Sequence, residues 1–214
     1  IEEHSIVVAV GGSGLYFQTL WNGMDYIPRI PGYVRGLIQL EFEKNGLEGL
    51  LVELASADPE YYEVVDKKNP QRIMRALEVI RGTGKKYSSF RGSKKGIKRP
   101  FENLKIGLTM DREILYQRID DRMEMMIRSG LFEEADRLKA YKAHNALQTV
   151  GYTEIFKYME GHYDKEEAIR LLKRNSRRYA KRQFTWFNRD PEIVWMEPSE
   201  ISKAKAIIEN RLSI

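Results

Sequence analysis

The sequence predicts a helix-rich α/β protein built around a parallel β-sheet, because three segments have strand character. Residues 5–10 form a continuous run dominated by β-branched residues that ends at two glycines, which is typical of a parallel strand buried on both faces. Further strand candidates lie at residues 104–110 and 192–196, and most of the remaining sequence has helical periodicity or loop character. A central parallel strand needs a neighbour on each side and helices over both faces. We therefore expect a sheet that is incomplete within this chain.

The composition favours a globular protein with an anionic partner. The length of 214 residues suits roughly one or two domains, and the net charge of +5 at pH 7 favours a polyanion such as nucleic acid. The chain has no cysteine, which excludes disulfides, a cysteine nucleophile and zinc–thiolate sites. No apolar run approaches the length of about 18 residues that can span a membrane. We expect a soluble, cytoplasmic protein with no membrane partner.

Residues 27–100 are predicted to form a helical insert. Prolines and a glycine break its entry, and helical periodicity then recurs between turn signals. The predicted helices cover residues 34–45, residues 47–55, a short segment from residue 59, and residues 70–81. The last part of the insert, residues 88–100, is rich in Ser, Gly, Lys and Arg and has few apolar residues. We therefore expect a mobile basic connection there.

Further helices are predicted after the strand candidate at residues 104–110. Asp111 is a suitable N-cap for the first of them, which is expected to end near Ser129. The later predicted helices cover residues 131–141, 152–159 and 165–187. Asp164 and Glu167 have the spacing of a capping box at the start of the longest one.

The helix predicted at residues 70–81 has a polar face that core packing does not explain. Asn69 is a good N-cap, a proline follows it, and glycines just beyond the end supply a stop signal. Apolar residues form one stripe at helical spacing. The residues of the opposite face are Gln71, Arg72, Arg75 and Glu78. Glutamine and arginine suit base edges and phosphates, so this face indicates a binding surface, the alternative being an ordinary solvated face.

A glycine-rich turn, residues 11–14, follows the first strand candidate and precedes a helix. Backbone amides and a positive helix end at such a junction can receive an anion. The turn lacks the Gly-Lys-Ser/Thr ending of a Walker A motif, and a tight strand-to-helix turn explains its glycines about equally well. A second glycine-rich segment, residues 82–85, follows a helix rather than a strand, so we reject it as a phosphate loop.

The segment at residues 170–189 carries eight basic residues and no acidic one. Solvated helices usually alternate charge sign, so this segment is predicted to face a polyanion. The basic residues that share one side of the predicted helix are Arg170, Arg174, Arg177, Arg178 and Lys181. The aromatic residues near its end, which could stack on bases or anchor the core, are Tyr179, Phe184, Trp186 and Phe187.

Arg118 and Arg122 lie one helical turn apart and face the same side of another predicted helix. The alternative to a binding role is a surface ion pair with Asp121 or Glu124. The three histidines are scattered without metal-ligand spacing, and no Gly-x-Ser-x-Gly nucleophile elbow occurs. The sequence therefore indicates neither a protein metal site nor Ser-His-Asp catalysis.

Four segments occur in the order found in one enzyme family, and together they resemble tRNA dimethylallyltransferases, also called tRNA isopentenylpyrophosphate transferases. The segments are 11–16 (GGSGLY), 69–75 (NPQRIMR), 149–154 (TVGYTE) and 180–186 (AKRQFTW). The ordered set carries the resemblance, which covers about residues 7–195. It implies a P-loop-kinase-like fold in which residues 1–26 and 101–214 form the core domain. Residues 27–100 would then be an insert that contacts the tRNA anticodon stem-loop.

The resemblance assigns binding roles to individual residues. The residues expected to contact tRNA are Ser13, Arg35, Gln71, Arg72, Ile73, Met74, Arg75, Thr149, Val150, Gly151, Tyr152, Thr153 and Glu154. The residues expected to line the substrate channel and hold diphosphate are Arg118, Arg122, Arg178, Lys181 and Arg182. Gln148 stands where many members of the family carry Arg, which affects one phosphate contact expected of the family.

The family carries an N-terminal phosphate-binding loop and, just beyond it, an Asp-Ser segment with the proposed catalytic base. Neither motif occurs in this sequence. We therefore expect an N-terminally truncated enzyme in which no catalytic residue is identified, with little or no turnover from this chain alone.

The resemblance implies transfer of a five-carbon prenyl group from dimethylallyl diphosphate to N6 of the adenosine immediately 3′ of the anticodon. Mg²⁺ would help to stabilise the departing pyrophosphate, and the protein is expected to be a monomer. One alternative is a non-catalytic RNA-binding module that uses the same basic surface. Another is a relative of nucleotide kinases, which would require a phosphate-loop lysine.

Overall fold

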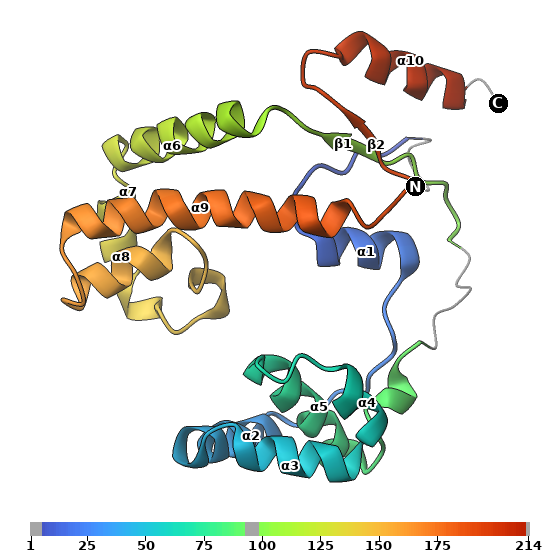
Figure 1. Ribbon diagram of the computed structural model, residues 1–214, viewed down its shortest axis with the longest axis vertical. Coiled ribbons are helices and arrows are strands. Elements are labelled where there is room, and N and C mark those ends of the chain that lie inside the picture. The colour runs from blue at the N-terminus through green and yellow to red at the C-terminus, as the bar shows by residue number, and fades with distance from the viewer. Residues whose placement is uncertain (1–5, 93–98, 213–214) are drawn as a thin grey trace. The chain divides into compact units, whose positions relative to one another are not determined.

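The computed structural model describes residues 6–92 and 99–212 and divides the chain into two compact units (Figure 1). The α/β unit comprises Ile1–Gly14 and Glu102–Ile214, and the helical unit comprises Leu15–Phe101. Each unit contains its own cluster of buried apolar side chains. Each can therefore hold functional side chains in place by itself. None of the helices in the described ranges combines the length and the apolarity needed to cross a membrane.

The buried core of the helical unit is formed by α5 (Pro70–Thr83) and the helices packed with it. The other elements of this region are α1 (Gly14–Asn22), α2 (Gly32–Asn45), α3 (Glu48–Ala57), α4 (Pro59–Val64) and the 3₁₀ turn η1 (Ser88–Phe90). Both α2 and α3 pack against α5. Ile38 of α2, Leu54 of α3 and Leu77 of α5 are completely buried where these helices meet. The helices predicted in this part of the sequence are confirmed to within a few residues at each end.

The ends of α5 follow the predicted capping signals. The Asn69 side chain accepts a hydrogen bond from the Arg72 amide at 3.3 Å, which satisfies a free N–H group of the first turn. Gly84 ends the helix in the left-handed conformation, with a φ of 68°. The helix extends to Thr83, slightly beyond the predicted end at residue 81.

The segment after α5 starts with an anchored turn. Asp58 is fully buried and accepts hydrogen bonds from the Ser88 amide at 2.7 Å and from the Ser88 hydroxyl at 2.8 Å. Because a buried carboxylate needs such partners, η1 is held against the junction of α3 and α4. The expected mobile connection at residues 88–100 therefore begins with a fixed turn. Residues 93–98 lie outside the described residues.

The sheet of the α/β unit is small. Strands β1 (Ile106–Leu108) and β2 (Val194–Met196) pair in parallel, with Ile106 opposite Val194. Each strand lies inside its predicted segment, residues 104–110 or 192–196, but is shorter than that segment. Only three residue pairs connect the two strands. The prediction of a buried strand at residues 5–10 is wrong for the described part of this run. Residues 6–10 pair with neither strand and are exposed, Val10 by 93%, while Ser5 lies outside the described residues.

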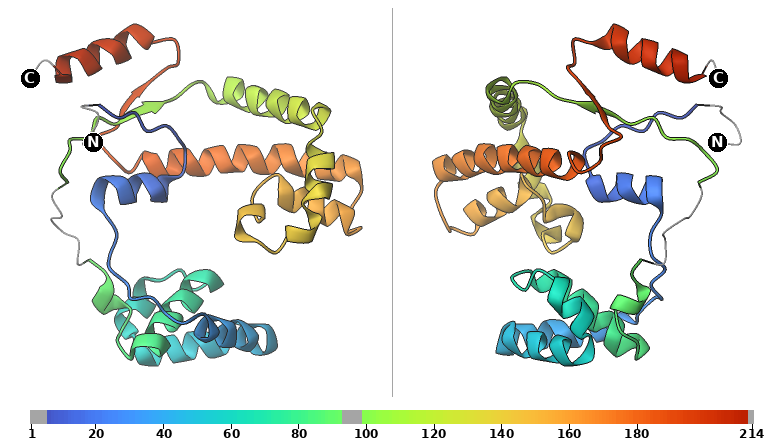
Figure 2. Two further views of the ribbon diagram at one scale, coloured as in Figure 1. Left: turned by 180° about the vertical axis from the view of Figure 1, so that it is seen from behind. Right: turned by 45° about the vertical axis from the view of Figure 1, so that its right-hand side comes forward.

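The helices of the α/β unit form a second core. They are α6 (Arg112–Arg128), α7 (Leu131–Arg137), α8 (Tyr152–Met159), α9 (Lys165–Phe187) and α10 (Ile201–Leu212), with 3₁₀ turns η2 (Lys139–Tyr141) and η3 (Asn145–Leu147). Helices α6 and α9 lie side by side, and α7 and α8 lie at one end of this pair (Figure 2). The predicted bounds of α8 and α9 are confirmed, whereas α7 ends before residue 141 and continues into η2. Helix α10 was not predicted.

Lys105 joins the start of β1 to the turn that follows α9. Its ammonium group lies 2.8 Å from the Asp190 carboxylate and 2.6 Å from that of Glu192, and its side chain is largely buried. Burial disfavours the charge, but the two carboxylates outweigh this effect and raise the pKa of Lys105 above its ordinary value. The end of α9 is thereby held in a fixed position relative to the sheet.

Candidate nucleic-acid interface

The polar face of the helical unit is organised around one buried carboxylate. Glu78 is 7% exposed and accepts from Arg35 Nη1 at 3.1 Å and from Arg75 Nη1 at 2.7 Å. Arg35, which belongs to α2, also donates from Nη2 to Gln71 Oε1 at 2.7 Å. The structure thus brings together three residues that the sequence predicted to contact tRNA. We call Arg35, Gln71, Arg75 and Glu78 the Glu78 network.

The remaining predicted residues of α5 separate into two groups. Arg72 is exposed beside the Glu78 network. Ile73 and Met74 are completely or almost completely buried in the core of the helical unit. Their side chains are therefore packing groups and lie away from the surface of this unit.

The glycine-rich turn of the α/β unit packs against the end of α9. Gln183 Nε2 donates to the Gly12 carbonyl at 3.1 Å. A Cβ atom on Gly12 would lie 2.0 Å from Gln183 Nε2, and one on Gly14 would lie 2.2 Å from the Trp186 ring. Close approach to α9 therefore explains these two glycines. Ser13 lies exposed between them, in the turn that contacts Gln183 and Trp186 of α9.

Three basic residues of α9 are paired with acidic side chains. Lys173 pairs with Glu124 at 2.6 Å, and Arg177 pairs with Asp120 at 2.5 Å, both across the contact with α6. Arg170 pairs with Glu167 in its own helix. These three residues therefore already have carboxylate partners, and the prediction that the whole basic segment faces a polyanion stays a prediction. Within the described ranges, Arg178, Lys181 and Arg182 have no acidic partner, and Arg182 lies 5.6 Å from the centre of the Tyr179 ring.

Arg118 and Arg122 are exposed on α6 but lie on a different side from α9. Asp120 faces α9, and each arginine is two residues from it, which is a rotation of about 200° around the helix. The alternative of ion pairs with acidic neighbours on α6 is not observed. Asp121 accepts from Gln117 instead, and Glu124 pairs with Lys173 and Arg128. The structure therefore does not join these two arginines to the basic end of α9.

The segment at residues 149–154 forms a turn that a buried glutamate holds in shape. Gly151 has a φ of 112°, a conformation that L side chains rarely adopt. Glu154 is buried, accepts from the Gly151 amide at 2.8 Å and also accepts from Asn175 of α9 at 2.7 Å. Thr149 is exposed, and the Thr153 amide donates to its carbonyl at 3.1 Å. The buried Glu154 carboxylate thus holds the exposed part of this turn in place.

The other predicted residues of this region are partly exposed. Val150, Tyr152 and Thr153 are half-buried, and the Tyr152 hydroxyl donates to Glu134, which raises the pKa of Tyr152. Gln148 is exposed, and its amide lies 3.4 Å from the Ala143 carbonyl.

Two aromatic residues at the end of α9 serve packing. Phe184 stacks on Trp195 of β2 with ring centres 5.7 Å apart, and Trp186 covers Gly14. The sequence left open whether these rings stack on bases or pack within the protein. For Phe184 and Trp186 the structure shows packing within the protein. Tyr179 remains exposed.

Sequence reasoning missed the central roles of Glu78 and Asn175. The spacing of Arg75 and Glu78, one helical turn apart, could have indicated their ion pair. The contact of Arg35 with Glu78 joins residues 43 positions apart, and that of Asn175 with Glu154 joins residues 21 apart. No local pattern signals such contacts.

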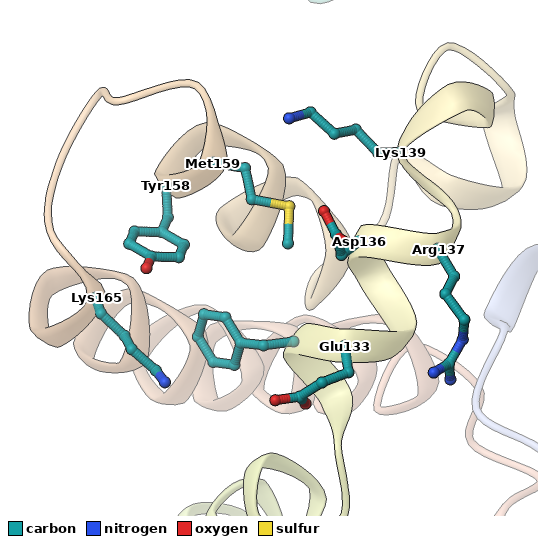
Figure 3. A pocket seen from close by; sticks show the side chains of 8 residues that line it. Glu133, Asp136, Arg137, Lys139, Tyr158, Met159 and Lys165 are labelled. Carbon is teal, nitrogen blue, oxygen red and sulfur yellow. The ribbon is translucent and has the colours of Figure 1, made fainter.

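A surface hollow of about 700 Å³ lies between α7, α8 and the start of α9 (Figure 3). Its lining residues are Phe132, Glu133, Asp136, Arg137, Lys139, Tyr158, Met159 and Lys165. Charges of both signs surround it, and it contains none of the residues predicted to bind substrate. The Lys165 ammonium lies 5.0 Å from the centre of the Phe132 ring. We assign this hollow no part in the candidate interface.

Metal ligands are not gathered anywhere in the described parts of the chain. Among residues 6–92 and 99–212 there is no group of three or more His, Cys, Asp or Glu that could hold a metal ion. The Mg²⁺ implied by the resemblance therefore finds no matching set of protein ligands in these ranges.

Comparisons with known proteins agree on one family. The family model described as IPP transferase matches residues 1–190. Two relatives named tRNA dimethylallyltransferase, from Cytophaga hutchinsonii and Christiangramia forsetii, are 51% and 47% identical to this chain over 210 and 201 residues. The matches cover 98% and 94% of this chain, and this chain spans 69% and 66% of the length of those relatives.

Two solved structures have related folds. A tRNA isopentenylpyrophosphate transferase from Bacillus halodurans is 32% identical with a TM-score of 0.58, over 94% of this chain and 64% of that one. A eukaryotic dimethylallyltransferase acting on tRNA is 25% identical with a TM-score of 0.72, over 95% of this chain and 56% of that one. The prediction of a helix-rich, P-loop-kinase-like α/β fold with an incomplete parallel sheet is confirmed.

Proposed function

Because this chain belongs to the IPP transferase family, as its sequence predicted, we propose that it forms part of a tRNA dimethylallyltransferase. The reaction moves a dimethylallyl group from dimethylallyl diphosphate to N6 of the adenosine immediately 3′ of the anticodon. The N6 amine forms a bond to C1 of the prenyl group, and the bond between C1 and the diphosphate oxygen breaks. Diphosphate leaves with the electron pair of that bond, and N6 loses a proton.

The Glu78 network is the observation that carries the RNA-binding part of this proposal. Arg35 and Arg75 are each fixed on one side by Glu78, while their side chains remain 44% and 40% exposed. Arginine donors that are held in place suit phosphates and the edges of unpaired bases. Arg72 adds a further charge beside them. This surface of the helical unit is proposed to contact the anticodon stem-loop.

The basic end of α9 is proposed to contribute to the diphosphate cradle. Arg178, Lys181 and Arg182 are exposed there, and Ser13 lies in the turn that packs on the same segment. Cations that lack a carboxylate partner can stabilise the negative charge that develops on a leaving diphosphate. Arg118 and Arg122 belong to a different side of the unit, so we propose an auxiliary role in the channel for them. No step is assigned to Mg²⁺.

The turn at residues 149–154 is proposed as a second RNA contact. The exposed Thr149 and the backbone at Gly151 form its outer surface, and Gly151 lets a ligand approach the backbone closely. Glu154 would support this contact from within. Its two oxygens are occupied by the Gly151 amide and the Asn175 side chain.

We propose that the protein acts in the cytoplasm as a monomer. We expect little prenyl transfer by the 214-residue chain alone, because the resemblance assigns a catalytic base to none of its residues. Rapid transfer by this purified chain would contradict that expectation.

Binding of the chain to a short anticodon stem-loop RNA tests the proposal. The measurement compares adenosine with guanosine at the target position over a series of salt concentrations. Salt-sensitive binding that prefers adenosine is expected. Binding that ignores the target base would favour an RNA-binding module without the proposed specificity, and absence of salt-sensitive binding would contradict the RNA assignment.

A further inference from the structure

The Glu78 network fixes which end of the Gln71 amide faces the protein. A guanidinium group has only hydrogen-bond donors, so the amide atom that meets Arg35 Nη2 at 2.7 Å must be the oxygen. The NH₂ group of Gln71 is then the part left for a ligand. Gln71 is exposed at the start of α5, beside Arg72. The surface therefore offers a neutral donor among cationic donors.

Glu78 controls this arrangement from beneath. Its two oxygens are divided between Arg35 and Arg75, and its own side chain is only 9% exposed. Charge-assisted hydrogen bonds of this kind restrict long side chains that would otherwise sample many rotamers. Because one nitrogen of Arg35 is held by Glu78, the other is directed at Gln71. The carboxylate thus acts on the outer surface through Arg35.

We propose that Glu78 is a positioning residue for RNA recognition, and that it holds Gln71 as a hydrogen-bond donor to acceptor atoms of an unpaired base. The acceptors are carbonyl oxygens or ring nitrogens, while the guanidinium groups take phosphate oxygens. This inference rests on the proposed function of the helical unit. It adds a residue that lies beneath the surface and contacts no RNA itself.

The substitution Glu78→Gln separates positioning from simple electrostatics. It removes a negative charge from a surface that binds a polyanion, so charge alone would strengthen RNA binding. Loss of positioning instead weakens it, by about tenfold for the best RNA, because the guanidinium groups and Gln71 are no longer held. We therefore expect Glu78→Gln to bind RNA more weakly although its net charge is more positive.

Glu41→Gln is the matched control in the same unit. Glu41 also pairs with an arginine, Arg81, which keeps a second partner in Glu53. The change in charge is the same, but the site is separate from the Glu78 network. This variant is expected to bind RNA as well as the unsubstituted chain, or slightly better.

The readout is the affinity of the 214-residue chain for an anticodon stem-loop RNA and for a set of single-base variants of its loop. A variant that only folds less well loses the same factor for every RNA, so the ratios between RNAs stay unchanged. In Glu78→Gln the ratios between the preferred RNA and the variants are expected to fall toward one. Binding that stays equally selective in Glu78→Gln would overturn the proposal.

Gln71→Leu keeps the test decisive if Glu78→Gln does not fold. Gln71 is exposed, so this change leaves the core intact, yet it removes the proposed donor. Selectivity is expected to fall in Gln71→Leu alone; where Glu78→Gln does fold, combining the two changes should reduce selectivity little further. Unchanged selectivity in Gln71→Leu would overturn the inference even if the chain binds RNA. Failure of the unsubstituted chain to bind RNA would instead contradict the proposed function.

Discussion

Two arginine-rich surfaces of this chain use their charges in different ways. In the helical unit, Arg35 and Arg75 converge on one buried carboxylate, and their side chains remain partly exposed. In the α/β unit, Arg177 and Lys173 each form an ion pair with a different acidic residue, where α6 and α9 pack together. A count of basic residues therefore does not locate a nucleic-acid interface. The partners of each charge decide whether it serves binding or stability.

The largest effect is expected when both arginines of the Glu78 network are removed together. Arg35→Ala with Arg75→Ala leaves Glu78 buried without a cation, which should lower the free energy of unfolding by about 3 kcal/mol. Each single change leaves the other arginine in place and should cost much less, so the pair is strongly non-additive. Urea denaturation of the three variants measures this difference. Adding Glu78→Gln to the double variant should recover most of the loss, and no recovery would contradict the explanation.

The next effect concerns the ion pairs between α6 and α9. Asp120→Ala leaves Arg177 half-buried without its partner, so the free energy of unfolding should fall by about 2 kcal/mol. Because Arg177 is assigned to packing rather than binding, RNA affinity should stay within about twofold of the unsubstituted value. Denaturation and RNA titration of the same preparation give both numbers. A large loss of RNA affinity in a folded variant would remove the distinction between the two surfaces.

A smaller effect is expected from the pH dependence of the contacts of Lys105. Burial favours the neutral form of Asp190, but hydrogen bonds from Lys105 and from the Glu192 amide outweigh it, so the pKa of Asp190 lies below its ordinary value of 3.8. This stabilisation is present above the ordinary pKa and is lost as pH falls through the lowered one. The raised pKa of Lys105 adds stabilisation that is present below 10.5 and is lost as pH rises through the raised value.

The substitution Lys105→Met tests whether these charge contacts contribute to stability. The variant should lose about 1 kcal/mol of stability at neutral pH and less at acidic pH, where Asp190 of the unsubstituted chain becomes protonated. Urea denaturation at several pH values measures the difference between the two proteins. A difference that does not depend on pH would show that apolar packing of the Lys105 stem, rather than its charge, is what matters.

The smallest effect is expected at the basic end of α9. Lys181→Gln removes an exposed charge that has no acidic partner in the described ranges, so affinity for inorganic pyrophosphate should fall by about threefold. Lys173→Gln is the control, because its ammonium group is already paired with Glu124. Isothermal titration calorimetry with pyrophosphate compares the two. Equal losses would show that only the net charge of the chain is being measured.

Much of the helical architecture was predictable because its signals are local. Asn69 and Asp111 cap their helices as expected, and the bounds of α8 and α9 follow from periodicity and capping residues. The small sheet was anticipated from the scarcity of strand candidates. The apolar run before Gly11 was read as a strand, but strand formation depends on a partner that a local pattern does not contain.

The candidate site was predictable only in part. The polar residues of α5 stand out in the sequence, since they occupy one helix face. Their link to Arg35 of α2 depends on the packing of two helices, and the burial of Glu78 follows from the same packing. Likewise, the sequence of α9 shows its basic residues but not the acidic side of α6 that neutralises some of them.

Amide hydrogen exchange with and without an anticodon stem-loop RNA tests the central claim most directly. The surface of the Glu78 network should become protected, in α2 around Arg35 and in the first two turns of α5. The contact between α6 and α9 around Asp120 and Arg177 should exchange at the same rate in both states. Protection of the α6–α9 contact without protection of α5 would contradict the account.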